Sequence, residues 1–497
     1  MASGLILAID QGTTNTKALL VGKAGVPVFR ASAAVELLHS AGGHVEQDPV
    51  ALWESVRRVI AKCVSFATES GQGIAAVAIS NQRETAVAWE AESGEPIGKA
   101  ISWQCTRSAE ICRRLEPQAG VIRAKTGLPL ATLISAGKWA WLLEHNGRAR
   151  AFAECGQLRL GTVDSWLIYR LTGGAVHATD LTNASRTGLL NLEECGWDGS
   201  LLKLFGIPGA AMAELRDSSG DFGECVGVTG LEGVPILAAI GDSHAAMFGH
   251  GHYAPGSVKA TYGTGSSLMA LTAGLTADSP KLARTIAWSI GGEPQYALEG
   301  NIAMTGSGLQ WVGEFLELTE PAAEAAALAA TVDDAAGVYF VPAMVGLGAP
   351  YWDAEARGSI SGLGRSHRAA HLARAAVEAI GYQIGDVFRA MEEASGEVFP
   401  ALLADGGATR NGALMQFQAD ILDRPVLRSG QEELSAIGAA WLAGLALGWW
   451  RSLAEIEGIA RTDDRFLPGM EQSDRRSRLD GWRLAVARAR LTAEGER

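Results

Sequence analysis

The stretch ILAIDQGTTNTKALLVG, residues 6–22, decides the fold and raises the question of function. Two apolar runs flank the polar segment at residues 10–15, so the pattern predicts a strand, a turn and a second strand. A hairpin needs only two turn residues, usually of the Asn-Gly type. This turn has six small or polar residues, and an acid, Asp10, ends the first strand. The turn therefore has more hydrogen-bonding capacity than turning requires.

Turns of glycine and threonine expose backbone N–H groups and hydroxyls, which are the neutral donors that surround bound phosphates. A carboxylate at Asp10 would repel a phosphate unless a cation lies between them. Hydrated Mg²⁺ suits that position, because it is held through one or two carboxylates together with phosphates. A purely structural hairpin is the alternative, and for a single such turn it is the better interpretation.

A second copy of the pattern lies about half a chain length further on. Residues 259–271, KATYGTGSSLMAL, again run from an apolar strand through a Gly/Thr turn into an apolar strand. Residues 236–248 and 402–417 each run from a strand through a Gly/Asp turn into a helix. A hairpin followed by an acidic turn thus occurs in each half. The repeat predicts two related domains that face each other across a cleft, and it makes phosphate binding the better interpretation of the turns.

Composition and charge limit the classes of protein. A chain of 497 residues is too long for one ordinary core, and 47% hydrophobic with 20% charged residues is typical of globular domains. The net charge of −13 disfavours nucleic acid and anionic membranes as partners. Residues 434–450 form an uncharged, helix-like run that is shorter than the ~20 residues of a membrane span. We expect a buried core helix there.

Other local patterns predict an α/β fold and a reducing compartment. Residues 74–80 and 234–240 are typical of buried strands, and residues 55–66 and 371–394 of helices. Strands and helices alternate along the chain, which favours α/β architecture. The N-terminus lacks the layout of a signal peptide. The six cysteines show no metal-like spacing, so we expect reduced thiols in a cytoplasmic protein.

Signatures of other nucleotide-binding and hydrolytic classes do not occur. The sequence has no G-x-x-x-x-G-K-[ST] loop and no G-x-G-x-x-G fingerprint, so P-loop enzymes and dinucleotide-binding dehydrogenases are disfavoured. It also lacks His-Glu-x-x-His and Gly-x-Ser-x-Gly, the commonest metalloprotease and serine hydrolase motifs.

Long motifs along nearly the whole chain resemble the FGGY family of carbohydrate kinases. They include AIDQGTTNTKA, GHVEQDP, ISNQRETAVAWE, GTVDSWLIYRLTGG, TDLTNASRTGL, TYGTGSS, YALEGNIAMTGSGLQW, VGLGAPYWDAEARG and DGGATRNGALMQFQADIL. Within the family they look most like the members that phosphorylate glycerol. The resemblance implies the duplicated actin/Hsp70/hexokinase-like ATPase fold. It also implies an N-terminal domain at residues 1–248 for substrate and phosphate, and a C-terminal domain at residues 249–497 for the nucleotide.

The resemblance implies Asp242 as the catalytic base that accepts the proton of the substrate hydroxyl. A carboxylate suits a loose phosphoryl-transfer transition state, which needs little deprotonation until late. A helix N-cap is the structural alternative for Asp242. ATP and Mg²⁺ are the implied cofactors, with Asp10 at the metal. The matching nucleotide and phosphate positions are Thr13, Thr14, Asn15, Lys17, Thr264, Gly306, Gln310, Gly407, Ala408 and Asn411. Lys17 stands where an arginine is usual, which keeps the charge but loses the forked donor.

Arg83 and Glu84 match the residues that bind a polyol in the family, because an adjacent guanidinium and carboxylate can hold neighbouring hydroxyls. A salt-bridged strand end is the alternative for this pair. Trp103 would supply an apolar wall for the carbon chain. His244 fits a ligand contact and a structural role equally. Residues 475–490 predict a docked terminal helix with a solvated arginine face.

Three pocket positions depart from the glycerol-phosphorylating members. Leu133 replaces a tyrosine, Ser243 a glutamine and Ser267 a phenylalanine. The loss of two aromatic rings enlarges the pocket, and the hydroxyls of Ser243 and Ser267 would need hydrogen-bond partners. Both effects favour a substrate longer than glycerol. The segment between Gly227 and Ile236 also lacks the loop associated with inhibition by fructose 1,6-bisphosphate, so the sequence does not predict that regulation.

The sequence therefore predicts a cytoplasmic, ATP- and Mg²⁺-dependent kinase for a terminal hydroxyl of a small polyol or sugar, with a C4–C5 polyol favoured. A ketopentose kinase of the xylulose or ribulose type, a true glycerol kinase and a catalytically silent sugar or nucleotide sensor are the alternatives. By family resemblance we expect a homo-oligomer, a dimer or a tetramer. We expect no nucleic-acid or membrane partner.

Overall fold

The stretch at residues 6–22 forms a hairpin of β1 (Gly4–Gln11) and β2 (Asn15–Val21), in which Asp10 lies opposite Lys17. The backbone N–H of Gly12 donates to the carbonyl of Asn15 at 2.9 Å and closes the turn. Successive strand residues face opposite sides of a sheet. Leu5 to Ile9 are all buried, so both faces of this sheet are covered. The predicted strand, turn and strand are confirmed.

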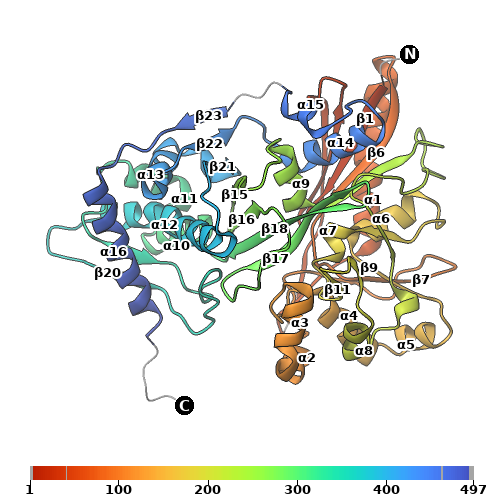
Figure 1. Cartoon of the computed structure of the whole chain (residues 1–497), viewed down its shortest axis with the longest axis horizontal. Coiled ribbons are helices and arrows are strands. Elements are labelled where there is room, and N and C mark those ends of the chain that lie inside the picture. Colours follow the sequence, from red (N-terminus) through yellow and green to blue (C-terminus); the bar gives the residue numbers. More distant parts are fainter. Residues whose placement is uncertain (1–3, 41, 460–462, 492–497) are drawn as a thin grey trace. The chain divides into compact units, whose positions relative to one another are not determined.

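The structure is a computed structural model that describes residues 4–40, 42–459 and 463–491 (Figure 1). The chain divides into two compact units. Unit 1 takes the described residues of Met1–Tyr253, Arg284–Ala297 and Glu433–Ala460, and unit 2 takes those of Ala254–Ala283, Leu298–Glu432 and Arg461–Arg497. Two segments from the second half of the sequence thus belong to unit 1.

The central sheet of unit 1 has the strand order β14-β6-β1-β2-β3. β6 (Gly73–Asn81) runs parallel to β1 and to β14 (Ile236–Gly241), whereas β3 (Pro27–Ala34) pairs antiparallel with β2. Helix α1 (Pro49–Glu69) begins after Asp48, whose side chain accepts from the N–H of Val50. Its buried residues pack on the β1 face that holds Leu5, Leu7 and Ile9.

Helix α14 (Leu434–Ala446) packs against β1, β6 and β14. Its residues from Ala436 to Gly444 are all buried, which confirms the predicted core helix. The helix ends at Ala446, before the predicted end at residue 450. Among residues 4–40, 42–459 and 463–491, no helix is long and apolar enough to span a membrane.

The remaining elements of unit 1 include several small sheets. One has the strand order β4-β5-β8, a second pairs β7 with β9, and a third pairs β10 with β13. A fourth pairs β11 with β12. The strands are β4 (Leu38–Ser40), β5 (His44–Gln47), β7 (Val87–Glu90), β8 (Ala100–Ile101), β9 (Leu158–Gly161), β10 (Ala178–Asp180), β11 (Leu190–Asn191), β12 (Gly196–Trp197), β13 (Glu214–Arg216), most of β17 (Ala283–Ile290) and the first half of β18 (Glu293–Ile302). The helices are α2 (Ala109–Leu115), α3 (Ala119–Thr126), α4 (Ser135–His145), α5 (Gly147–Glu154), α6 (Val163–Leu171), α7 (Leu181–Ala184), α8 (Gly199–Phe205), α9 (Asp242–Gly249) and α15 (Leu453–Glu457), with short 3-10 turns at Glu116–Gln118 and Gly209–Ala211.

The sheet of unit 2 has the order β18-β16-β15-β21-β22-β23. β15 (Val258–Tyr262) pairs antiparallel with β16 (Ser266–Leu271) and parallel with β21 (Leu402–Asp405). β21 is parallel to β22 (Val426–Ser429), and β23 (Asp463–Phe466) forms the antiparallel edge. The other elements are α10 (Gly306–Phe315), α11 (Pro321–Ala329), β19 (Tyr339–Val341), β20 (Ser359–Ser361), α12 (Ala369–Ser395), a 3-10 turn at Gly407–Arg410, α13 (Gly412–Leu422) and α16 (Gln472–Ala489).

The helices of unit 2 follow their sequence patterns. α12 buries Ile380, Ile384, Val387 and Met391 against the sheet, as its apolar stripe predicts. α16 buries Trp482, Val486 and Ala489, which confirms the docked terminal helix.

The two sheets share one topology, which confirms the duplication predicted from the two hairpins. In each unit the first hairpin strand lies between its antiparallel partner and a parallel strand, and a second parallel strand follows: β2-β1-β6-β14 in unit 1 and β16-β15-β21-β22 in unit 2. The sequence pattern matched the acidic turn after residues 236–241 with the one after residues 402–405, and this match is wrong by one strand position in the sheet. β21, which ends at Asp405, occupies the position of β6 and not that of β14. Local strand-turn-helix patterns look alike at every parallel strand, so only the pairing tells them apart.

Candidate active site

Asp10 lies one residue before the end of β1 and accepts a hydrogen bond from Ser80 Oγ on the adjacent strand β6 at 2.9 Å. Removal from water, together with the negative charge of Asp242, raises the pKa of Asp10 to about 6. Ser80 and Lys17 act in the opposite direction. The carboxylates of Asp10 and Asp242 therefore repel each other at this edge of the sheet. A cation between them would relieve that repulsion.

The turn after Asp10 exposes Thr14 and Asn15, and Asn15 Nδ2 donates to Thr14 Oγ1 at 3.3 Å. Thr13 is held more firmly. Its Oγ1 accepts from Trp103 Nε1 at 2.9 Å, and its carbonyl accepts from Gln47 Nε2 at 2.7 Å. The turn thus presents exposed hydroxyl and amide groups on a braced backbone, which is suitable for binding an anion.

Lys17 does not stand alone beside this turn. Its Nζ lies 2.9 Å from Glu433 Oε2, at the residue that precedes α14. Arg30 lies near the other oxygen of Glu433, at 3.8 Å. Glu433 was not predicted from the sequence as part of this region, because no local pattern links it to Lys17.

Arg83 and Asp242 form an ion pair, with Nε 3.2 Å from Oδ1. Asp242 is the first residue of α9, and the N-cap position belongs to Gly241, the last residue of β14. Asp242 Oδ1 accepts from the backbone N–H of Ser243 at 2.6 Å. The structural alternative, an N-cap at Asp242, is therefore not what the helix shows.

Glu84 has a backbone φ of 61°, in the left-handed region that non-glycine residues rarely occupy. Arg186 Nε donates to its carboxylate at 2.7 Å, and both side chains are buried. Its carbonyl accepts from Ser135 Oγ and from Lys138 Nζ. Backbone strain that the surroundings enforce tends to occur at functional sites.

Lys138 is a buried lysine that also donates to the carbonyls of Leu133 and Ile134. Burial lowers its pKa to about 8. Lys138 thus ties the backbone of Leu133 to that of Glu84. Trp103 is held beside Thr85, whose hydroxyl accepts from the backbone N–H of Trp103 at 3.2 Å.

His244 is buried, and its Nε2 lies 3.1 Å from Thr285 Oγ1 on β17. This contact favours the structural interpretation over a ligand contact.

Unit 2 holds the remaining candidates. Thr264 is exposed in the second Gly/Thr turn, and its carbonyl accepts from the N–H groups of Thr305 and Ser307 at the start of α10. Gln310 follows one turn later on α10 and donates to Glu314. A side chain at Gly306 would place its Cβ 2.6 Å from the carbonyl of Gly263. Close backbone packing is therefore sufficient to require a glycine here, and the contact of Gly306 with the nucleotide stays a prediction.

Gly407, Ala408 and Asn411 lie at the end of β21, where Asn411 caps α13 by accepting from the N–H of Leu414. A hollow of about 220 Å³ opens here, lined by Gly406, Gly407, Thr409 and residues of the loop after β22. The constrained glycine is Gly406, with a φ of 96° and the carbonyl of Tyr262 2.4 Å from its virtual Cβ. Open space surrounds Gly407.

Ser267 on β16 donates a long hydrogen bond of 3.5 Å to Glu299 Oε1. The expectation that this hydroxyl lacks a partner is therefore wrong. Glu299 is buried on β18, two strand positions before Asn301, and the sequence pattern did not indicate the contact.

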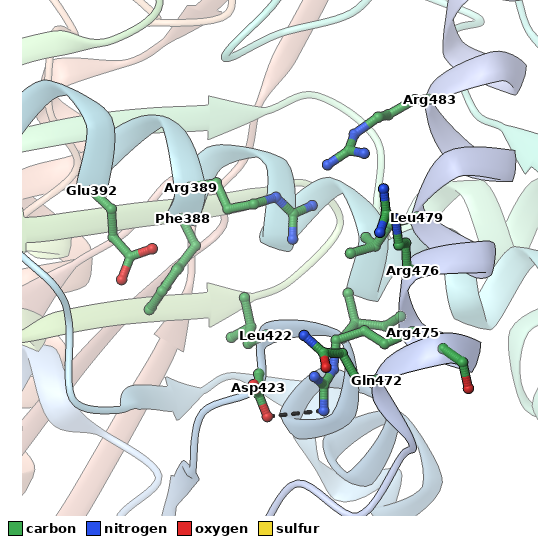
Figure 2. A pocket seen from close by; sticks show the side chains of 12 residues that line it. Phe388, Arg389, Glu392, Leu422, Asp423, Gln472, Arg475, Arg476, Leu479 and Arg483 are labelled. Atoms are coloured by element: carbon green, nitrogen blue, oxygen red, sulfur yellow. Dashed lines mark ion pairs between the residues drawn. The ribbon is translucent and has the colours of Figure 1, made fainter.

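A groove of about 620 Å³ in unit 2 contains none of these candidate residues (Figure 2). It lies between α12, the end of α13 and α16, and it is lined by four arginines. Three of them are paired with acidic side chains: Arg475 with Asp423, Arg389 with Asp386, and Arg483 with Asp480. The groove is therefore not a simple cationic site.

Within the described part of the chain, no group of three or more His, Cys, Asp or Glu side chains could hold a metal ion by itself. Mg²⁺ does not need such a group, because it binds through one or two carboxylates plus phosphates and waters. The mutual repulsion of Asp10 and Asp242 fits a cation of this kind.

Comparisons with known proteins bear on the whole chain. Models of the N-terminal and C-terminal domains of the FGGY family of carbohydrate kinases match residues 5–249 and 258–447. A glycerol kinase of Burkholderia cenocepacia is 44% identical over 497 residues and covers 99% of each chain. The crystal structure of a Plasmodium falciparum glycerol kinase with ADP superposes with a TM-score of 0.94, at 31% identity and 99% coverage of both chains. A xylulose kinase of Lactobacillus acidophilus shares the fold, with a TM-score of 0.88 at 23% identity and 99% coverage of both chains.

The duplicated sheets and these likenesses define a two-domain kinase of the actin/hexokinase-like class. The chain belongs to the FGGY family of carbohydrate kinases, and it is an ATP-dependent kinase that uses an alcohol group as acceptor. The family, the fold class and the kinase activity expected from the sequence motifs are confirmed.

Proposed function

We propose that this kinase transfers a phosphoryl group from ATP to a terminal hydroxyl of glycerol. The observation that supports the site most strongly is the 3.2 Å ion pair between Arg83 and Asp242. A catalytic base must lie within reach of the hydroxyl that its neighbour holds. The full-length likeness to glycerol kinases at 44% identity supports glycerol over a ketopentose.

In this proposal Arg83 and Glu84 hold neighbouring hydroxyls of the substrate, and Asp242 accepts the proton from the reacting one. Arg186 binds one oxygen of the Glu84 carboxylate, and we assign the other oxygen to the substrate. Trp103, Leu133 and Ser243 contact the carbon chain and its remaining hydroxyl. The left-handed backbone at Glu84 is the strain that this arrangement requires.

Nucleotide binding is divided between the two Gly/Thr turns and the hollow in unit 2. Thr13, Thr14, Asn15 and Lys17 receive the terminal phosphates, and Thr264 receives the middle ones. Binding of a phosphate by Lys17 competes with its ion pair to Glu433. Gly306, Gln310, Gly407, Ala408 and Asn411 surround the phosphate, ribose and base of the nucleotide. The hollow of about 220 Å³ beside Gly407 offers space for part of it.

Mg²⁺ would be held at Asp10, where it supplies charge neutralisation on the phosphates. The protein's own part in that step is the carboxylate of Asp10, which Ser80 orients through its 2.9 Å hydrogen bond. Because transfer to water competes with transfer to substrate, the reacting groups must be enclosed when both ligands are bound.

A C4–C5 polyol is the second candidate substrate. Leu133 and Ser267 stand where the resemblance places aromatic rings, and the lost volume favours a longer carbon chain. The argument from unpaired hydroxyls is weaker, since Ser267 already donates to Glu299. For this reason we place glycerol first.

The test compares kcat/KM for glycerol, erythritol, the pentitols, xylulose and ribulose in the parent enzyme and in Leu133→Tyr/Ser267→Phe. We expect glycerol to lead in the parent by tenfold or more, about 1.4 kcal/mol of transition-state discrimination. A longer polyol that leads in the parent, with the preference moving to glycerol in the double variant, would establish the second candidate. A chain that binds ATP and phosphorylates none of them would contradict the proposal.

The division of roles between residues 1–248 and 249–497, the cytoplasmic location and the homo-oligomer stay predictions.

A further inference from the structure

We propose that residues 180–186, the segment that includes the end of β10 and helix α7, position the substrate-binding and catalytic residues of unit 1. The inference rests on the proposed function of Arg83, Glu84 and Asp242. The sequence TDLTNASR, residues 179–186, was part of the family resemblance, but no role followed from it. The structure links this segment separately to the chain beside each of the three functional residues.

The sheet ends just before the functional residues. In the pairing of β6 with β14, the last register pair is Asn81 with Gly241. Arg83 and Asp242 follow this pair, so no sheet hydrogen bonds hold them. Their positions depend on whatever holds the ends of the two strands.

Thr182 holds the end of β14. Its Oγ1 accepts from the backbone N–H of Gly241 at 2.9 Å, one residue before Asp242. The same hydroxyl donates to Asp180 Oδ1 at 2.9 Å. The start of α9, which bears the proposed base, is thereby tied to a buried carboxylate.

Asn183 holds the end of β6. Its side-chain amide and that of Asn81 exchange two hydrogen bonds, at 2.9 and 3.1 Å, and all these atoms are buried. Asn81 Nδ2 also donates to the carbonyl of Gln82, the residue before Arg83. Amide pairs of this kind fix orientation, because each group must present both a donor and an acceptor.

Arg186 holds the third functional residue directly, through its 2.7 Å bond to the Glu84 carboxylate. Three contacts from one short segment therefore reach the chain at or beside Arg83, Glu84 and Asp242.

Asp180 anchors the segment. Its two oxygens accept from the backbone N–H groups of Thr182 and Asn183 and from three side chains, Thr182 Oγ1, Asn183 Nδ2 and Ser218 Oγ. Burial raises the pKa of Asp180, whereas these donors favour its ionised form. A fully bonded buried network has a single low-energy arrangement, which is what a positioning element needs.

The test uses Thr182, because its hydroxyl can be removed with little change of shape. Thr182→Val deletes the contact to Gly241, and Thr182→Ser keeps the hydroxyl. Thr187→Val is the matched control, because Thr187 is equally buried and directly follows the segment. Its hydroxyl donates to the carbonyl of Ala184 at 2.7 Å and accepts from the N–H of Leu189, and neither partner is a functional residue. ADP binding and the thermal midpoint of each variant report on the fold.

We expect Thr182→Val to lower kcat with glycerol by about 10–100-fold, because small displacements of a reacting group cost that much. The KM for ATP should change by less than about twofold. Thr182→Ser and Thr187→Val should stay within about threefold of the parent kcat. Equal kcat values for Thr182→Val and Thr187→Val would overturn the inference.

A second background tests whether Thr182 acts through Asp242. In an Asp242→Asn enzyme, adding Thr182→Val should lower the residual kcat by less than about twofold, since residues that act as a unit are not additive. A full further loss would show a role independent of Asp242 and would also overturn the inference. If the parent enzyme phosphorylates no polyol, the proposed function fails instead, and the two failures are distinct.

Discussion

Arg83 and Asp242 form an ion pair at the ends of two neighbouring parallel strands, with Nε 3.2 Å from Oδ1. The two partners differ in exposure: the side chain of Arg83 is 10% exposed and that of Asp242 is 40% exposed. A held guanidinium therefore lies beside a carboxylate that ligands can reach. This relationship is what a general base beside a hydroxyl-binding group requires.

The first prediction concerns Asp242. We expect Asp242→Asn to lower kcat by roughly 10²–10⁴, because it removes a general base while keeping the shape of the side chain. Folding and nucleotide binding should persist, which circular dichroism and an ADP titration would check. Near-parental turnover in a folded variant would rule out Asp242 as the base.

The second prediction concerns the buried pair of Glu84 and Arg186. Arg186→Met leaves a buried carboxylate without its 2.7 Å partner, so we expect a loss of about 3–5 kcal/mol in the free energy of unfolding. Urea denaturation measures this loss. Glu84→Gln/Arg186→Met should recover part of the stability, because the buried charge is gone, but it should not recover the KM for the polyol. An Arg186→Met variant that is as stable as the parent would show that the ion pair does not stabilise the fold.

The third prediction is a pH dependence from His177. Its Nε2 donates to the carbonyl of Leu160 at 3.0 Å, and its ring packs edge-on against Trp89. Burial lowers the pKa of His177 to about 4 from its ordinary value of 6.5. The unfolded chain therefore binds a proton between pH 6.5 and 4 that the folded chain does not. Stability from this group is complete above pH 6.5 and decreases as the pH falls toward 4.

His177→Gln removes that titration and keeps a donor. Urea denaturation at pH 7, 5.5 and 4.5 measures the free energy of unfolding of parent and variant. As the pH falls, the parent should lose stability relative to the variant. A difference that stays constant with pH would show that His177 does not titrate as described.

The fourth prediction concerns the contact of α14 with α9. A Cβ at Gly438 would lie 1.9 Å from the carbonyl of Ala245, on the helix that begins with Asp242. Gly438→Ala must push the helices apart, so we expect a loss of about 1–3 kcal/mol in stability and a lower kcat. Gly199→Ala on α8 is the control, because its Cβ would meet no atom within 4 Å. Unchanged melting and turnover in Gly438→Ala would contradict the close packing.

Local patterns were sufficient for much of the fold. The hairpin at residues 6–22, the apolar stripe of α12 and the terminal helix α16 were all predictable, because alternation and helical spacing are properties of neighbouring residues. The repeated hairpin also predicted the duplication. The matching of the acidic turns failed, because strand order depends on pairing and not on the strand's own residues.

Partners far apart in the chain were not predictable. Lys17 pairs with Glu433, Glu84 with Arg186, and Gly241 with Thr182, and each contact joins segments that no local pattern connects. The same holds for Ser267, whose partner Glu299 lies on another strand.

The sequence by itself determined the elements, the duplicated plan and the types of residue at the candidate site: the Gly/Thr turns, Asp10, the Arg83–Glu84 pair and Asp242. Only the tertiary structure decided which groups hold them, with Thr182, Asn183 and Arg186 around the candidate residues of unit 1. The physical reason is that secondary structure follows from the periodicity of adjacent residues. A buried hydrogen bond instead depends on the distance and direction between two groups, which exist only once the chain is folded.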